Sequence, residues 1–246
     1  MYAEQFEAIQ IAGYSASLCP DSVIQEGKPL RDIPEGATVV YRGWMLNPAE
    51  YTALHEAVMA ASATMLTSPD AYLSAHHLPN WYPLISEYTP ETIVLSESAD
   101  LENELTAFGW DGFFIKDYVK SLKTSVGSFI RDPSQIESVI AEMKSFRGEL
   151  EGGLCIRKIE PLDPDSEVRH FVLNGKAFSP SGAPCPEIVL AAASRIPSPY
   201  FSVDVIRRDD GELRIVEVGD GQVSDLAGWS VDRFAEMWNC VNESAT

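Results

Sequence analysis

The sequence predicts an α+β fold, and three observations carry that prediction. Strand-like and helix-like segments are segregated along the chain instead of alternating regularly, which argues against a doubly wound parallel sheet. Two turn signals in the second half, Asn174-Gly175 and Asp210-Gly211, are typical of hairpins between antiparallel strands. The length of 246 residues, 45% of them hydrophobic, is enough for one compact domain of two lobes or for two small ones, with a sizeable core.

The first half of the chain combines a short strand with helices and an ordered loop. Ala37–Tyr41 (ATVVY) has strand composition, and Glu50–Met65 has helical periodicity. Turn residues alternate with aromatic ones over Thr67–Leu84, which predicts an ordered loop with short helical pieces. Ser96–Phe108 opens with a capping serine and acidic residues, so we expect a helix there.

From Gly112 onward, strands and short connectors dominate. Strands are expected at GFFIKDYV and at LCIRKIE, with a helix from about Pro133 to Phe146 between them. Two hairpins are expected at EVRHFVL-NG-KAFSPSG and at YFSVDVIRRDDGELRIVEVG. Helices are also expected at Pro186–Ala193 and at Val231–Trp238.

The overall charge argues against a polyanionic partner. The chain has 37 acidic and 18 basic residues and a formal net charge of −19, so its field repels nucleic acid and anionic membrane surfaces. Ten of the 18 basic residues nevertheless lie between Lys116 and Lys176. That stretch can still hold a small anion.

We expect a cytoplasmic protein with reduced thiols. Cys19, Cys155, Cys185 and Cys240 are far apart and form no CxxC pair, so the sequence signals neither a zinc site nor a disulfide framework. The first residues, MYAEQFEAIQ, lack the basic and apolar regions of a signal peptide, and no apolar stretch approaches membrane-spanning length.

A glutamate stands in the otherwise apolar strand RIVEVGDGQ. If Asp210-Gly211 is a two-residue turn, the pairs across the hairpin are Arg208/Leu213, Ile206/Ile215, Val205/Val216 and Asp204/Glu217. Like charges directly opposite in a sheet repel by up to about 1 kcal/mol, and a bound cation removes that cost. With Asp220 just beyond, these carboxylates suit Mg²⁺ or Mn²⁺. The alternative is a pair of acids that merely face solvent.

Basic residues supply candidate phosphate contacts. Lys116 ends the apolar strand FFIK, and Lys120 and Ser121 follow in a polar connector that could fold over phosphates. The chain has no GxxxxGK[ST] loop and no GxGxxG, so a solvated lysine face is the alternative. Arg169 shares a strand face with Glu167, and a fixed guanidinium suits a phosphate, although a surface ion pair would look the same.

Four segments together resemble the ATP-grasp fold. They are FIKDYVKS, LCIRKIEPL, EVRHFVLNGK, and FSVDVI followed by IVEVGDGQVSDL. Over roughly Thr38–Trp238 the chain most resembles the small clade named for two conserved arginines and a lysine, found in bacteria and their phages; YRGWM and HHLPNWY resemble its reduced pre-ATP-grasp lobe. The resemblance implies such a lobe over residues 1–110 and an ATP-grasp core over residues 111–246, with ATP between two α+β lobes.

The resemblance also implies roles for individual residues. Expected nucleotide contacts are Lys116, Lys120 and Ser121, the hinge Arg157, Lys158, Ile159 and Glu160, and the strand residues Glu167 and Arg169. Within the hinge, backbone groups of Lys158 and Ile159 would meet the adenine edge and Glu160 the ribose. Asp204 and Glu217 would hold magnesium. Many ATP-grasp enzymes have an asparagine where this chain has Gly219, so Asp220 is the expected third ligand.

The chemistry implied is phosphorylation of a carboxylate by ATP, followed by attack of a nitrogen nucleophile on the acyl phosphate. Arg169 and Lys116 would be the catalytic residues, and Arg42 and His77 are candidate contacts for a small-molecule, peptide or protein substrate. No Ser-His-Asp or Cys-His set is evident. Two alternatives stay open, which are a nucleotide-binding module without turnover and a metal-dependent hydrolase.

Overall fold

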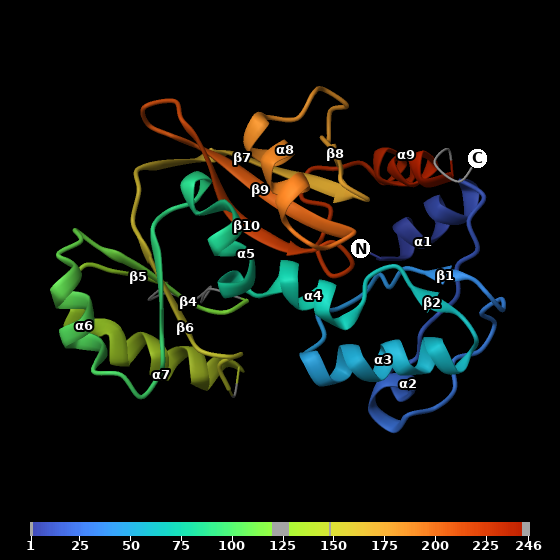
Figure 1. Ribbon diagram of the computed structural model, residues 1–246, viewed down its shortest axis with the longest axis horizontal. Helices are drawn as coiled ribbons and strands as arrows, with labels where there is room; N and C mark the ends of the chain where they lie inside the picture. Colours follow the sequence, from blue (N-terminus) through green and yellow to red (C-terminus); the bar gives the residue numbers. More distant parts are fainter. Residues whose placement is uncertain (1, 120–127, 148, 243–246) are drawn as a thin grey trace.

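The computed structural model describes residues 2–119, 128–147 and 149–242 (Figure 1). Its strands form two antiparallel sheets of four strands each and one short parallel pair, with helices around them, which confirms the predicted α+β class. Lys120 and Ser121, the expected phosphate-covering residues, lie outside the described part of the chain. No helix in that part is long and apolar enough to cross a membrane.

The first sheet is built from the two expected hairpins. Its strands, in the order β10-β9-β7-β8, are β7 (Leu162–Leu173), β8 (Lys176–Phe178), β9 (Tyr200–Arg208) and β10 (Leu213–Asp220). Asn174 and Gly175 adopt φ angles of 50° and 75°, so the first hairpin has the predicted two-residue turn. Helix α8 (Glu187–Arg195) packs on the apolar face of this sheet.

The second hairpin turns through three residues, so the two-residue turn expected there is wrong. Arg208 N donates to the carbonyl of Glu212 at 2.7 Å, closing a loop of three residues. A two-residue primed turn needs positive φ at both central positions. Gly211 has a φ of 92°, whereas Asp210 is not in the positive region. Only glycine reaches that region without steric cost, so the longer loop is preferred.

A bulge in β10 nevertheless restores the expected pair of carboxylates. Ile215 lies opposite Val205, where the predicted register placed Val216. The register then shifts between Ile215 and Glu217, so Val216 is the extra residue and Glu217 lies opposite Asp204. The pairing of the two acids is therefore as predicted, although the turn that suggested it is different.

The second sheet carries the strand with the candidate lysine. Its strands, in the order β3-β6-β4-β5, are β3 (Thr92–Leu95), β6 (Leu154–Lys158), β4 (Phe113–Asp117) and β5 (Phe129–Ile130). Helices α6 (Leu101–Phe108) and α7 (Ile136–Arg147), the latter preceded by the 3₁₀ turn η2 (Pro133–Gln135), cover one face. Strand β3 and helix α6 precede residue 110, the expected boundary between the two domains, whereas β4, β5 and β6 follow it. The second sheet and its helices are therefore built from both sides of that boundary.

The N-terminal part packs beside the first sheet. It contains α1 (Tyr2–Ile11), α2 (Asp21–Glu26), α3 (Pro48–Ala60), and β1 (Thr38–Val39) in parallel with β2 (Thr64–Met65); α1 lies against α9 (Val231–Asn242). The helix expected to reach Met65 stops earlier, because Ser62 has a φ of 58° and the chain then forms β2. Its start is fixed by a capping box between Asn47 and Glu50.

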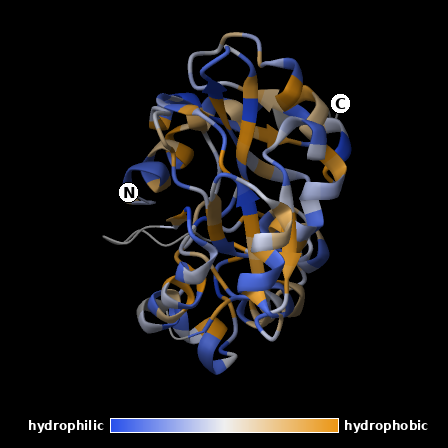
Figure 2. Ribbon diagram, turned by 90° about the vertical axis from the view of Figure 1, so that its left-hand side faces the viewer, coloured by the Kyte–Doolittle hydropathy of each residue, from blue (hydrophilic) through white to orange (hydrophobic). Residues whose placement is uncertain are grey.

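Two short helices fill the space between these parts. They are α4 (Pro69–His76) and α5 (Leu78–Ile85), followed by the 3₁₀ turn η1 (Ser86–Tyr88). Trp81 of α5 is 1% exposed and packs in the same core as Val203 and Val205 of the first sheet, so it is a packing anchor. Figure 2 shows hydrophobic residues concentrated along the strands and hydrophilic ones on outer turns of the helices.

Candidate active site

Two carboxylates stand side by side on neighbouring strands of the first sheet. Asp204 of β9 lies opposite Glu217 of β10. Asp204 is 3% exposed, whereas 45% of the Glu217 side chain is accessible. The alternative of two solvent-facing acids is therefore wrong for Asp204, because a buried carboxylate needs a partner.

Lys116 reaches this pair from the other sheet. It lies on β4, and its Nζ is 3.6 Å from Oε1 of Glu217, although only 6% of the lysine side chain is exposed. Burying an ammonium group without a partner is costly, so the carboxylate accounts for the buried position. The two sheets therefore meet where the predicted lysine and the predicted metal ligands lie.

Arg169 holds Asp204 in a two-point ion pair. Its Nε donates to Oδ1 at 2.8 Å and its Nη2 to Oδ2 at 2.6 Å, while Nη1 donates to Oδ1 of Asp225 at 2.5 Å. Trp229 fixes the backbone, because its Nε1 donates to the Arg169 carbonyl at 2.9 Å. Glu167, the other candidate on this strand, is exposed.

The cluster sets two cations, Lys116 and Arg169, against three carboxylates. Burial raises the pKa of Asp204, and the hydrogen bonds from Arg169 act against that shift. Burial alone would lower the pKa of Arg169, but its bonds to Asp204 outweigh this and leave the pKa above its ordinary value. Arg169 is therefore a fixed cation beside Asp204 and Glu217.

The carboxylate pair fits a magnesium ion that is shared with phosphates. Mg²⁺ in nucleotide sites commonly takes one or two protein carboxylates and completes its shell with water and phosphate oxygens. Asp204 and Glu217 supply such a pair from adjacent strands. Among the described residues, no group of three or more His, Cys, Asp or Glu side chains could hold a metal ion. The donor set therefore suits a metal–nucleotide complex better than a closed protein site.

The structure does not bring Asp220 to this pair. Alternation along β10 puts it on the opposite face from Glu217. It is fully buried, and its Oδ1 accepts from N and Nε2 of Gln222 at 2.9 and 3.1 Å, while the same Nε2 donates to the Tyr51 hydroxyl at 2.7 Å. Asp220 is therefore not placed to act as the third metal ligand, contrary to the sequence prediction.

Arg157, the first hinge residue, is turned toward protein atoms. Its Nη1 donates to the Val216 carbonyl, its Nη2 to the Thr89 hydroxyl, and its Nε to Oγ1 of Thr92 at 3.3 Å. The side chain is 4% exposed. These contacts span β6, the segment before β3, and β10, so Arg157 connects the two sheets instead of presenting its guanidinium to an open site.

The other hinge residues, Lys158, Ile159 and Glu160, also form hydrogen bonds within the protein. The N–H groups of Lys158 and Ile159 donate to backbone carbonyls of neighbouring segments at 2.8 and 3.3 Å. Glu160 accepts from Arg214 through both carboxylate oxygens, each at 2.8 Å. A contact between these particular groups and an adenine or a ribose would require the chain to exchange partners.

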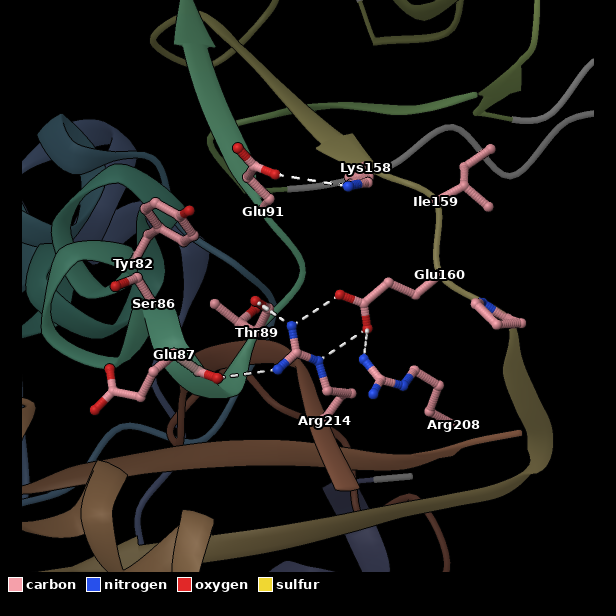
Figure 3. A pocket seen from close by; sticks show the side chains of 11 residues that line it. Tyr82, Ser86, Glu87, Thr89, Glu91, Lys158, Ile159, Glu160, Arg208 and Arg214 are labelled. Atoms are coloured by element: carbon pink, nitrogen blue, oxygen red, sulfur yellow. Dashed lines mark hydrogen bonds and ion pairs between the residues drawn. The ribbon is translucent and has the colours of Figure 1, made fainter. Parts of the chain in front are cut away.

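A cavity of about 670 Å³ lies beside the hinge (Figure 3). Its walls are the segment from α5 to β3, the hinge residues Lys158 to Glu160, and the turn end of the second hairpin. Lys116, Asp204 and Glu217 do not line it. In Figure 3, Arg214 lies between Glu160 and the backbone of Glu87 and thus closes one side. The volume is in the range that small-molecule sites occupy.

Arg42 is a packing residue. Its Nε and Nη2 donate to Oε1 of Gln5 at 3.0 and 2.7 Å, and its Nη1 donates to the Gly221 carbonyl. The guanidinium carbon lies 4.8 Å from the centre of the Phe234 ring. These contacts tie α1, α9 and the loop after β10 together, so the geometry does not favour the expected substrate contact.

His77 connects the junction of α4 and α5 to the second sheet. Its Nε2 lies 2.8 Å from Oε1 of Glu151, and its ring packs against Tyr118 at a centroid distance of 5.7 Å. Only 14% of the side chain is exposed. His77, the candidate substrate contact, is thus engaged with other parts of the protein, because its partner Glu151 lies just before β6.

Two features of the site have no counterpart in the sequence prediction. Asp225 completes the contacts of Arg169, and it follows the glutamate strand in the segment VSDL. Phe114 pairs with Phe129 across β4 and β5, with ring centres 4.8 Å apart and Phe129 62% exposed. Because Phe114 and Lys116 are two residues apart on β4, their side chains lie on the same face of the sheet. This spacing could have indicated from the sequence that Phe114 accompanies the candidate lysine.

Comparison with known families assigns the chain to a family. The sequence model for the ATP-grasp domain of family 3 in the clade named for two arginines and a lysine matches residues 107–239. The chain belongs to this family. The match covers Lys116, Arg169, Asp204 and Glu217 of the ATP-grasp protein, and confirms the resemblance inferred from the sequence. Comparison with curated protein sequences gives no match.

Solved structures similar to this ATP-grasp protein include a synthetase, an ATP-grasp ligase and a macrocyclase. D-cycloserine synthetase DcsG superposes with a TM-score of 0.67 at 17% identity, over 96% of this chain and 92% of that one. ATP-grasp ligase PsnB, complexed with a variant of its minimal precursor, Mg and ADP, gives 0.63 at 12% identity, over 97% and 92%. Macrocyclase MdnC from Microcystis aeruginosa MRC, bound with precursor peptide MdnA, gives 0.60 at 12%, over 98% and 95%. The likeness establishes the fold.

Proposed function

We propose that this ATP-grasp protein is an ATP-dependent carboxylate–amine ligase that works through an acyl phosphate. The observation that carries the proposal is the meeting of Lys116 from one sheet with Asp204, Glu217 and Arg169 from the other. This set contains both the cations and the oxygen ligands that a metal-bound triphosphate needs. Membership of the ATP-grasp family supports the proposal. The similarity of the fold to a synthetase and to an ATP-grasp ligase supports it as well.

In this proposal the nucleotide lies between the two sheets. Lys116 and Arg169 contact its phosphates, and Asp204 with Glu217 holds Mg²⁺, which would neutralise phosphate charge when bound. The base lies toward the hinge of residues 157–160, next to Phe114. Arg169 would then turn part of its guanidinium from Asp204 to the transferred phosphoryl group.

The reaction needs no nucleophile from the protein. A substrate carboxylate oxygen attacks the terminal phosphorus, the bond to ADP breaks, and an acyl phosphate forms. An amine nitrogen then attacks the acyl carbon, the carbon–oxygen bond to phosphate breaks, and the amine releases a proton. Fixed cations and closely packed sheets favour this sequence, because they position the groups and limit access of water to the labile intermediate.

The substrates we propose are a small-molecule or peptide carboxylate and an amine. Similar structures include D-cycloserine synthetase, an ATP-grasp ligase complexed with a variant of its minimal precursor, and a macrocyclase bound with a precursor peptide. A nucleotide-binding module without turnover is the second candidate, favoured by one observation, the glycine at position 219 where many ATP-grasp enzymes have an asparagine.

Calorimetry with ATP and Mg²⁺ on wild type and Glu217→Gln tests the proposal. The variant keeps the shape of the side chain and removes one metal-ligating charge, so binding should weaken at least about tenfold, a typical effect of losing a metal-site group. Glu212→Gln, an exposed glutamate on the same hairpin, should bind like wild type.

Binding by the wild type would justify a screen of acid and amine pairs for ADP release. Turnover that requires both substrates would establish the ligase. Binding with no ADP release for any pair would favour the non-catalytic module, and a folded wild type that binds no ATP would contradict both.

A further inference from the structure

Glu217 faces Asp204 only because β10 contains an extra residue. If the register at Ile215 continued, Val216 would lie opposite Asp204 and Glu217 opposite Val203, a fully buried core residue. A slip of one residue moves a side chain to the other face of a sheet. The bulge thus decides whether Glu217 points to the core or to the site.

The bulge is held from the other sheet. An extra residue has no regular partner in the ladder, and a buried carbonyl left without a hydrogen bond is costly. The Val216 carbonyl accepts a hydrogen bond from Nη1 of Arg157 on β6, 59 residues away in the sequence. Arg157 therefore satisfies the backbone group directly before Glu217.

The surroundings of Arg157 are unusual for a cation. It is 4% exposed, its other donors go to the hydroxyls of Thr89 and Thr92, and no carboxylate of the described residues forms an ion pair with it. Burial lowers the pKa of Arg157 to about 10, and the negative charge of Glu217 acts against that shift. Burying a cation among neutral partners costs stability, so this arrangement favours a specific positioning role over simple stabilisation.

We propose that Arg157 is a positioning residue that fixes the bulge at Val216, keeps Glu217 opposite Asp204, and does not contact the nucleotide. This inference rests on the proposed function, because the position of Glu217 opposite Asp204 matters only if Glu217 is a metal ligand. It replaces the nucleotide contact expected for Arg157 from the sequence.

The test is the Mg²⁺ concentration that gives half-maximal ATP binding at fixed ATP, measured by calorimetry. Arg157→Met should raise it about tenfold or more, as loss of a group that orients a metal ligand does. Arg157→Lys should recover part of the effect, because the lysine ammonium group can still donate to the Val216 carbonyl and keeps the charge. Arg233→Met is the matched control, since it removes a partly buried arginine of α9 that also donates to a backbone carbonyl, that of Ser179, without touching the bulge or the hinge. Its Mg²⁺ dependence should stay close to wild type.

Deletion of Val216 adds a second arm. It removes the bulge while leaving Ile215 opposite Val205 and Glu217 opposite Asp204. In the deleted chain, replacing Arg157 by Met should have little further effect on the Mg²⁺ requirement. An equal loss with and without Val216 would overturn the proposal.

A crystal structure of Arg157→Met separates this inference from the ligase proposal, because it needs no nucleotide. The expected result is a changed register, with Glu217 no longer opposite Asp204. An unchanged register together with a wild-type Mg²⁺ requirement would overturn the positioning role. A changed register in a protein whose wild type binds no ATP would sustain the positioning role and overturn the ligase. If Arg157→Met does not fold, Arg157→Lys takes its place in both measurements.

Discussion

Asp220 was expected from the sequence to be a metal ligand, but the fold buries its side chain away from the carboxylate pair. Its carboxyl group is fully buried, its Oδ1 is held by Gln222, and its Oδ2 has no hydrogen-bond partner among the described residues. Burial raises its pKa to about 7. An unfolded aspartate titrates near 3.9, so the folded chain binds more protons than the unfolded one between these two values.

The free energy of unfolding should therefore fall as the pH rises through that window. Each pH unit between the two pKa values is worth about 1.4 kcal/mol, and the loss levels off above pH 7. Asp220→Asn keeps the acceptor for Gln222 and cannot ionise, so it should gain stability relative to wild type between pH 5 and pH 8. Urea unfolding at both pH values measures this. Asp209→Asn, an exposed site, is the control, and parallel pH profiles for Asp220→Asn and wild type would contradict the prediction.

Among the elements, α5 depends on its neighbours for its structure. It has eight residues and an internal proline, Pro83, so its own hydrogen bonds stabilise it little. Its buried side chains Leu78, Trp81 and Ile85 instead pack into the core of the first sheet. The helix is thus held in place by the sheet.

Trp81→Ala should lower the free energy of unfolding by about 3 to 5 kcal/mol, the usual cost of removing a large buried side chain. Trp44→Ala removes a tryptophan that is 76% exposed and should cost little. Chemical denaturation of both variants gives the comparison. Similar losses for the two variants would contradict a role of Trp81 as the anchor of α5.

The elements also show what the sequence could and could not predict. Strands and turns with strong local signals were predictable, because Asn174-Gly175 and the alternation along β9 act locally. The bulge at Val216 was not, because its partner Arg157 belongs to another sheet. The contacts of Arg169 with Asp225 and of Arg42 with Gln5 are also tertiary, and no spacing rule reports them.

At the scale of the whole molecule, the site joins both sheets. Lys116 belongs to the second sheet, whereas Asp204 and Glu217 belong to the first. A nucleotide bound at this junction, as proposed, would stabilise both sheets together, because unfolding of either one would release it.

ATP with Mg²⁺ at about 100 times its dissociation constant should add about 2.7 kcal/mol to the free energy of unfolding and raise the melting temperature by several degrees in a single transition. Differential scanning calorimetry measures the shift. Glu212→Gln should behave like wild type, and Glu217→Gln should show a smaller rise at the same concentrations. Two separate transitions, only one of which shifts, would place the nucleotide on one sheet alone.

The two-point ion pair between Arg169 and Asp204 also has a consequence for the order of events at the site. Both Asp204 oxygens carry hydrogen bonds from the guanidinium, so a divalent ion that arrives alone meets a ligand already in use. In the proposed function, a triphosphate would offer Arg169 new acceptors and thereby release the carboxylate. Entry of the nucleotide would then be an exchange of partners, by which the pair would select the metal–nucleotide complex over the free ion.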